Sequence, residues 1–292
     1  MSAQGEVRRA GSGYAEVMLL GVAVVWGTSY GMARQALFFY PVAGFLFIRF
    51  MLTFLILLPA LKNHWREATA AGLAPGSVLL AIFLCETFGV AQTSASNAAF
   101  LISLCVVLTP FVEWRVFRTR PETRAFIAAG VSLCGALLLT GGTLTGLGVG
   151  DALLLGAALL RAVMVCLTKT LTQRHDVPAL ALTAVQTGVV AAGALAVLLG
   201  TYHTLPALPI SPGFWIATLY LVLICTIFAF FAQNYAVQRT TPTRASLLMG
   251  TEPLFGALFA TLWLGESLTP AAWLGGLFIV GASLWATRPR RQ

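Results

Sequence analysis

Four ionisable side chains lie inside stretches of the sequence that are otherwise apolar. Arg49, Glu86, Arg161 and Glu252 each stand within a run that is long enough to cross a lipid bilayer. A charged group in hydrocarbon is costly, so such residues usually face a water-filled cavity or pair with one another. These four therefore predict either a charged ligand site or structural ion pairs within the membrane.

Glu86 and Arg161 lie near the centres of their runs, so both side chains can face one central cavity. The planar guanidinium of Arg161 is suited to hold a carboxylate through two parallel hydrogen bonds. The alternative is a structural Glu–Arg pair without a ligand. For Arg49, which lies further along its run, we expect a structural role in contacts with helix ends or loop carbonyls.

Glu252 is followed directly by Pro253. The proline removes the hydrogen-bond donor for the carbonyl of Met249, four residues earlier, and should bend the helix there. With Gly250 adjacent, we expect a hinge with exposed backbone beside a carboxylate. The alternative is that Glu252 caps a freed backbone donor or pairs with a neighbouring helix.

A second group of candidates is polar and uncharged, or aromatic. Polar side chains in membrane helices hydrogen-bond either to substrate or to a neighbouring helix. Aromatic side chains either line a cavity and stack on a ring, or simply pack. The candidates for substrate binding in this group are Trp26, Ser29, Tyr30, Phe83, Gln92, Asn97, Phe230, Gln233 and Asn234.

Ten apolar stretches contain or flank these residues, and together they make up most of the sequence. A spanning helix needs about 20 mostly apolar residues, and only 10% of this chain is charged. The sequence predicts an all-α polytopic membrane protein, with turn-rich connectors at 70–75 and 205–212. The predicted spans are 16–35, 41–61, 75–95, 97–117, 124–142, 150–171, 179–200, 213–235, 243–264 and 270–287.

The cations alternate between the two sides of the predicted bundle. Lys and Arg are absent from 94–97, 142–149, 200–212 and 265–269, and gather in the opposite connections. Since short cytoplasmic loops carry excess Lys and Arg, both termini should be cytoplasmic, as tails 1–15 and 288–292. The net charge of +8 then reflects topology in a cell inner (plasma) membrane rather than binding to nucleic acid.

The chain also resembles itself at a spacing of roughly 140 residues. Leu19-Leu20-Gly21 corresponds to Leu154-Leu155-Gly156, and Pro110 corresponds to Pro253. We expect two five-helix repeats, 16–142 and 150–287. Because five is odd, the second repeat should be inverted in the membrane, which places a ligand site at the interface of the repeats near the midplane.

These motifs resemble the drug/metabolite transporter superfamily in its ten-span, two-repeat (EamA-like) branch. The resemblance covers nearly the whole chain. Its first half carries Trp26-Gly27-Thr28-Ser29 and Arg49, and its second half carries Glu252-Pro253-Leu254-Phe255 and Leu264-Gly265-Glu266. The first repeat has Phe117-Arg118-Thr119-Arg120 where the second has Leu-Gly-Glu. The resemblance implies small-metabolite transport, and is closest to the aromatic amino acid exporters.

We therefore expect a secondary transporter or facilitator that exports small metabolites, above all amino acids including aromatic ones, by alternating access. The alternatives are export of other amphipathic metabolites or drugs, proton-coupled antiport, and nucleotide-sugar transport. No nucleotide-binding, zinc-protease or nucleophile-elbow motif occurs in the sequence, so we expect no enzyme activity, cofactor or metal. Its partners should be a small-molecule substrate and the lipid bilayer, and the chain should be a monomer, with a dimer as the alternative.

Overall fold

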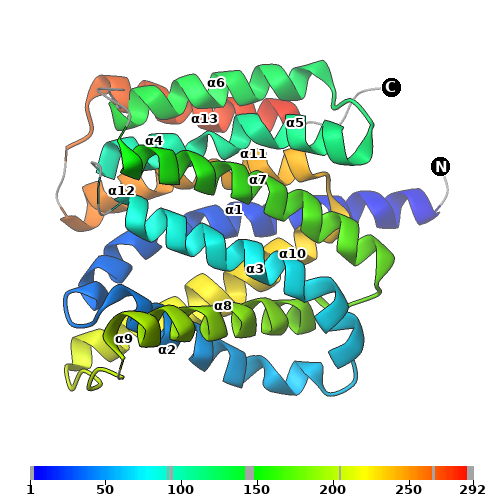
Figure 1. The fold of residues 1–292 in the computed structure, drawn as a ribbon. Helices are drawn as coiled ribbons and strands as arrows, with labels where there is room; N and C mark the ends of the chain where they lie inside the picture. Colours follow the sequence, from blue (N-terminus) through cyan, green and yellow to red (C-terminus); the bar gives the residue numbers. More distant parts are fainter. Residues whose placement is uncertain are drawn as a thin grey trace.

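The computed structural model is a bundle of long helices that run approximately side by side (Figure 1). It describes residues 3–90, 92, 95–141, 148–203, 205–264 and 267–287. Within these ranges, the side chains of 3–12, 30, 34, 90, 95–97, 260, 263 and 264 lie outside the description. The described residues form helices and connections, without a strand.

The helices follow the predicted spans closely. Those of the first half are α1 Ala3–Leu37, α2 Val42–Leu57, the short 3₁₀ helix η1 Leu58–Leu61, α3 Trp65–Val90, α4 Ala95–Ser103, α5 Cys105–Phe117 and α6 Thr123–Thr140. Those of the second half are α7 Val149–Arg174, α8 Ala179–Tyr202, α9 Pro212–Val222, the π-helix η2 Leu223–Phe228, α10 Ala229–Arg239, α11 Pro242–Met249, α12 Glu252–Leu264 and α13 Pro270–Thr287.

Nine segments of the described chain are long and apolar enough to cross a membrane. The remaining predicted span, 243–264, is divided between α11 and α12. The predicted all-α multi-pass architecture is therefore confirmed.

The bend predicted beside Pro253 is also confirmed. The helix stops after Met249 and restarts at Glu252, and the amide of Leu254 bonds to the carbonyl of Thr251 at 3.1 Å in the new first turn. Proline at the second position of α12 is tolerated because the first turn of a helix needs no amide donor there. In the first half, α4 and α5 are separated at Leu104.

The connector predicted at 70–75 was wrong. These residues are helical, because α3 begins at Trp65 and continues through Pro75. The next residue, Gly76, explains why the helix continues through the proline. A Cβ on Gly76 would lie 2.9 Å from the Cβ of Val189, so α3 packs closely on α8 at this position. Close packing of α3 on α8 outweighs the single hydrogen bond that the proline removes.

Glycines also bring the two halves of the chain into close contact. A Cβ on Gly27 of α1 would lie 2.6 Å from the backbone nitrogen of Gly256 in α12. Likewise, a Cβ on Gly135 of α6 would lie 2.6 Å from the carbonyl oxygen of Gly275 in α13. The last helices of the two halves, α6 and α13, therefore lie side by side along the bundle (Figure 1).

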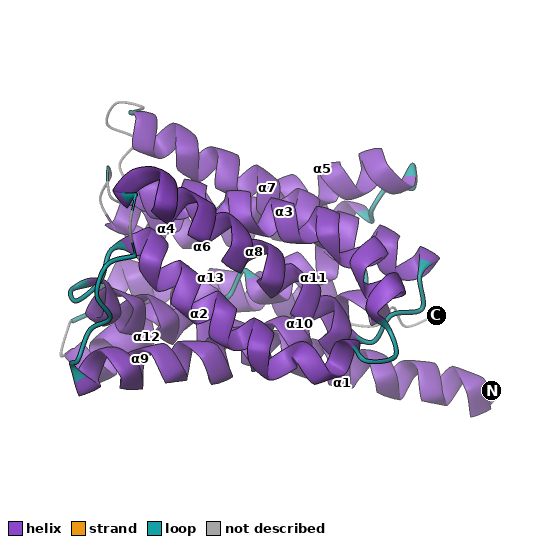
Figure 2. Ribbon diagram, turned by 60° about the horizontal axis from the view of Figure 1, so that its bottom comes forward, coloured by secondary structure: helices purple, strands orange, loops and turns teal. Residues whose placement is uncertain are grey.

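The start of α1 and the end of α13 lie at the same end of the bundle (Figures 1 and 2). We call this end the terminal face. It also holds the connections α2–α3, α5–α6, α7–α8 and α10–α11. Near it, the two halves meet where the hydroxyl of Thr109 in α5 donates to the hydroxyl of Ser246 in α11 at 2.9 Å.

Candidate functional site

The three charged residues predicted near the membrane midplane form one cluster. Nε of Arg161 in α7 lies 2.5 Å from Oε1 of Glu86 in α3. Nη1 of the same arginine lies 3.4 Å from Oε2 of Glu252, the first residue of α12. We call Glu86, Arg161 and Glu252 the charged cluster. Its glutamates come from opposite halves of the chain, so the arginine joins the two repeats.

The two carboxylates of these ion pairs are buried, so their stability depends on the arginine. Glu86 is 9% exposed and Glu252 is 7% exposed, while the side chain of Arg161 is 22% exposed. A buried carboxylate that loses its partner is strongly destabilised, so the pairs hold the site together. Two carboxylates facing one guanidinium leave a formal excess of one negative charge. The cluster thus offers carboxylate acceptors and a guanidinium donor side by side.

One predicted aromatic residue, Trp26, covers the guanidinium, and a second, Phe230, packs against Trp26. The centre of the Arg161 guanidinium lies 5.8 Å from the centroid of the Trp26 ring, which is within cation–π range. The ring of Trp26 in turn lies 5.5 Å from that of Phe230 in α10, at an interplanar angle of 59°. We call the rings of Trp26 and Phe230 the aromatic wall. The charged cluster contacts this wall through Trp26.

The orientation of Trp26 depends on an irregular turn that the sequence analysis missed. Its indole nitrogen donates to the carbonyl oxygen of Cys225 at 3.1 Å. Cys225 lies in the π-helix η2, where the backbone hydrogen-bond register shifts, as in the bond from the amide of Ala229 to the carbonyl of Ile224 five residues earlier. Such π-turns expose backbone groups and are frequent at functional sites.

Arg49 contacts a side-chain hydroxyl of the same turn and two aromatic rings, instead of the helix ends or loop carbonyls expected for it. Its Nε donates to the hydroxyl of Thr226 at 2.8 Å. Its guanidinium also lies 5.3 Å from the ring centroid of Phe50 and 5.9 Å from that of Phe83. The predicted site residue Phe83 thus contacts Arg49, and it packs on the same apolar cluster as Trp26 and Phe230.

Two predicted amides lie in α10. Asn234 is 2% exposed, and its Nδ2 donates to Thr183 Oγ1 at 2.9 Å and to Gln186 Oε1 at 2.8 Å in α8. Gln233 is also buried, and its Oε1 has no hydrogen-bond partner among the described residues. Asn234 is committed to a contact between helices, whereas Gln233 offers an unsatisfied acceptor.

The remaining predicted site residues lie apart from the charged cluster or outside the description. The hydroxyl of Ser29 donates to a carbonyl three residues earlier in α1, at 2.8 Å. Gln92 is exposed, and its amide donates to the carbonyl of Phe88 at 2.9 Å. The side chains of Tyr30 and Asn97 fall outside the described residues.

Comparison with known proteins identifies the family that shares this arrangement. The sequence profile of the EamA-like transporter family matches residues 13–141 and again residues 148–288. The chain belongs to the EamA-like transporter family. The resemblance to the two-repeat branch of drug/metabolite transporters is thereby confirmed, and the protein is a multi-pass membrane transporter.

Relatives of this EamA-like transporter agree with that assignment. An uncharacterized transporter of Archaeoglobus fulgidus is 26% identical over 268 residues, covering 91% of this chain and 83% of the relative. The uncharacterized transporter YwfM of Bacillus subtilis is 28% identical over 216 residues, covering 68% of this chain and 66% of the relative. A solved crystal structure matches with a TM-score of 0.76 at 17% identity, covering 94% of this chain and 96% of that one, which supports the shared fold.

Proposed function

We propose that this EamA-like transporter exports amino acids, with apolar and aromatic side chains preferred. The observation that carries the proposal is the ion pair between Arg161 and Glu252 beside the ring of Trp26. A zwitterion can insert into an ion pair without leaving a charge alone. Its carboxylate binds the guanidinium, and its ammonium binds the carboxylate that the guanidinium released.

The lengths of the two contacts indicate which pair opens. Arg161 lies 2.5 Å from Glu86 but 3.4 Å from Glu252. The longer contact is the weaker hydrogen bond, so the ligand carboxylate competes for Arg161 with Glu252. A purely anionic ligand would displace Glu252 from the guanidinium and cost this buried carboxylate its contact with the arginine, which is unfavourable. A zwitterion avoids this penalty.

The aromatic wall supplies the preference for the side chain. Trp26 lies against the charged cluster, and it packs with Phe230 and Phe83 on one apolar cluster. An apolar or aromatic side chain that leaves water for this wall gains roughly 25 cal/mol for each Å² of buried apolar surface.

Access alternates between the two sides in this proposal. The breaks at Leu104 and at Gly250–Thr251 let the halves of two spans move separately, since hinges concentrate where backbone hydrogen bonds are interrupted. The cation-rich terminal face would be cytoplasmic in the inner membrane, by the positive-inside rule. Transport would run from that face outward through a single chain.

The experiment is uptake into liposomes that contain the purified protein. L-Phenylalanine should be transported saturably. Phenylalaninamide lacks the carboxylate, and 3-phenylpropionate lacks the ammonium, so both should compete at least tenfold less well, which corresponds to about 1.4 kcal/mol. Equal competition by either analogue would rule out recognition of the zwitterion.

A second candidate mechanism is proton-coupled exchange, favoured by the excess of one carboxylate over guanidinium in the charged cluster. A proton on Glu252 would neutralise that excess while the ligand is absent. The same liposomes distinguish the two mechanisms. A pH gradient of either sign should leave the extent of phenylalanine uptake unchanged in facilitation, and should drive accumulation in proton exchange.

A further inference from the structure

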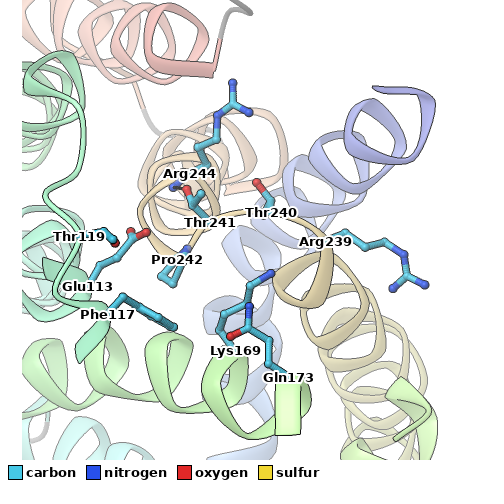
Figure 3. A pocket seen from close by; sticks show the side chains of 10 residues that line it. All are labelled: Glu113, Phe117, Thr119, Lys169, Gln173, Arg239, Thr240, Thr241, Pro242 and Arg244. Atoms are coloured by element: carbon cyan, nitrogen blue, oxygen red, sulfur yellow. Dashed lines mark hydrogen bonds between the residues drawn. The ribbon is translucent and has the colours of Figure 1, made fainter. Parts of the chain in front are cut away.

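A pocket opens on the terminal face, between the two halves of the chain. Its volume is about 350 Å³, within the range of small-molecule sites. It is lined from α5 by Glu113 and Phe117, from α7 by Lys169, and from the α10–α11 turn by Thr240 and Pro242. Figure 3 shows Glu113 and Lys169 entering from different helices, with this turn between them.

The pocket holds several polar groups with unused hydrogen-bonding capacity. Thr240 is 6% exposed, yet its hydroxyl has no partner among the described residues. Nζ of Lys169 donates to the carbonyl of Gln238 at 2.8 Å, and an ammonium has two further donors. An unpaired buried hydroxyl is costly, so a ligand that accepts its hydrogen bond would be favoured.

Glu113 offers the opposite charge on the other side of the turn. Its Oε2 accepts hydrogen bonds from the backbone amide of Thr243, at 2.8 Å, and from the hydroxyl of the same residue. Oε1 has no partner among the residues that the structure describes. The pocket thus presents donors with positive charge and an acceptor with negative charge, the complement of a zwitterion.

The pocket also lies along one helix with the charged cluster. Lys169 and Arg161 are both in α7, eight residues apart, which corresponds to about 12 Å along the helix axis. The two cations therefore mark two successive positions between the terminal face and the middle of the bundle. The carboxylate of a substrate can pass from one to the other.

We propose that this pocket is a docking site at which the substrate zwitterion binds before it reaches Arg161, with its carboxylate on Lys169 and Thr240 and its ammonium on Glu113. This inference rests on the amino acid transport proposed above. Phe117 supplies an apolar surface for the substrate side chain in the same pocket.

The test uses a reporter thiol at the pocket. Gln173 is exposed and lines the pocket, so Gln173→Cys should react with a membrane-impermeant charged maleimide. The exposed Cys134 is replaced by serine in this parent. L-Phenylalanine at four times its Kd should slow labelling about fivefold, because one fifth of the sites stay empty. Phenylalaninamide at the same concentration should give almost no protection.

Thr240→Val is the sharpest variant, because it removes a hydroxyl that bonds to no described residue. Its melting temperature should be unchanged or higher, while the affinity for phenylalanine, measured from the concentration dependence of protection, should fall at least threefold, about 0.7 kcal/mol of binding. Lys169→Gln should abolish protection, and Lys62→Gln, a cation on the same face but outside the pocket, should retain it. Arg161→Ala should keep protection while losing transport.

Two results would overturn the docking site. Only the second would also overturn the proposed amino acid transport. If Thr240→Val and Lys169→Gln are protected as fully as the parent, the docking site is wrong while amino acid transport stands. If the parent neither transports amino acids nor is protected by them, the proposed function fails and the docking site fails with it.

Discussion

The indole nitrogen of Trp26 donates a 3.1 Å hydrogen bond to the carbonyl oxygen of Cys225, across 199 residues of sequence. This bond joins α1 of the first half to the π-helix of the second half. It also fixes the ring that covers Arg161. The position of the aromatic wall is therefore set by a backbone carbonyl in an irregular turn.

Trp26→Phe tests that relationship, since it keeps an aromatic ring but removes the donor. The carbonyl of Cys225 would lose this partner, and an unsatisfied buried group costs about 1–3 kcal/mol. We expect a lower melting temperature and a higher KM for phenylalanine. Trp215→Phe is the matched control, because its indole bonds to the carbonyl of Pro209 in a connection away from the site.

Arg161→Ala should abolish transport, because no other residue in the charged cluster can bind a carboxylate. Removing one partner from a fully buried ion pair costs roughly 3–5 kcal/mol. We expect a lower value here because the side chain is 22% exposed. Uptake and thermal unfolding are measured together. Transport by Arg161→Ala at the rate of the parent protein would remove this arginine from the site.

Adding Glu86→Gln and Glu252→Gln to Arg161→Ala removes the two carboxylates that contacted the arginine. The triple variant should recover much of the stability lost by Arg161→Ala, because neutral amides are cheaper to bury than charges. It should remain inactive in uptake. Recovered stability without recovered transport separates the structural role of the cluster from its role in binding.

Gly27→Ala should weaken both folding and transport. The new Cβ would lie 2.6 Å from the backbone nitrogen of Gly256, so α1 and α12 must separate, and overpacking of this kind typically costs about 1–3 kcal/mol. Gly156→Ala is the control, since nothing lies within 4 Å of its Cβ position. The control should be neutral or slightly stabilising, because alanine favours a helix by up to about 1 kcal/mol.

Asn234→Leu distinguishes a packing amide from a binding amide. Asn234 donates its side-chain hydrogen bonds to two residues of α8, Thr183 and Gln186. We expect a lower melting temperature with an unchanged KM for phenylalanine in the protein that remains folded. A KM raised tenfold at normal stability would instead place this amide in contact with substrate.

The charged cluster illustrates how far the sequence alone could go. Glu86, Arg161 and Glu252 were found because charge is conspicuous in apolar runs, but which carboxylate pairs with the arginine depends on how α3, α7 and α12 pack. Pro253 marked the break in its span. Pro75 equally suggested the end of a helix, and this suggestion was wrong. The helix α3 continues through Pro75 because it packs on α8 there.

The π-helix Leu223–Phe228 could not be predicted in the same way. Its residues are as apolar as those of the α-helical turns around it, and a shift of hydrogen-bond register leaves hydropathy unchanged. The partner of Trp26 was therefore invisible in the sequence. The same holds for the pocket on the terminal face, because its lining residues come from α5, α7 and the α10–α11 turn.

The interrupted span gives Glu252 a second source of stabilisation. Because α12 begins at Glu252, this carboxylate sits at the positive pole of a half-helix, where the aligned peptide dipoles amount to about half an elementary charge. Glu86 lies within α3 and has no such pole beside it. When an incoming ligand binds the guanidinium of Arg161, the contact between Arg161 and Glu252 can open. The dipole of α12 then continues to stabilise the Glu252 carboxylate.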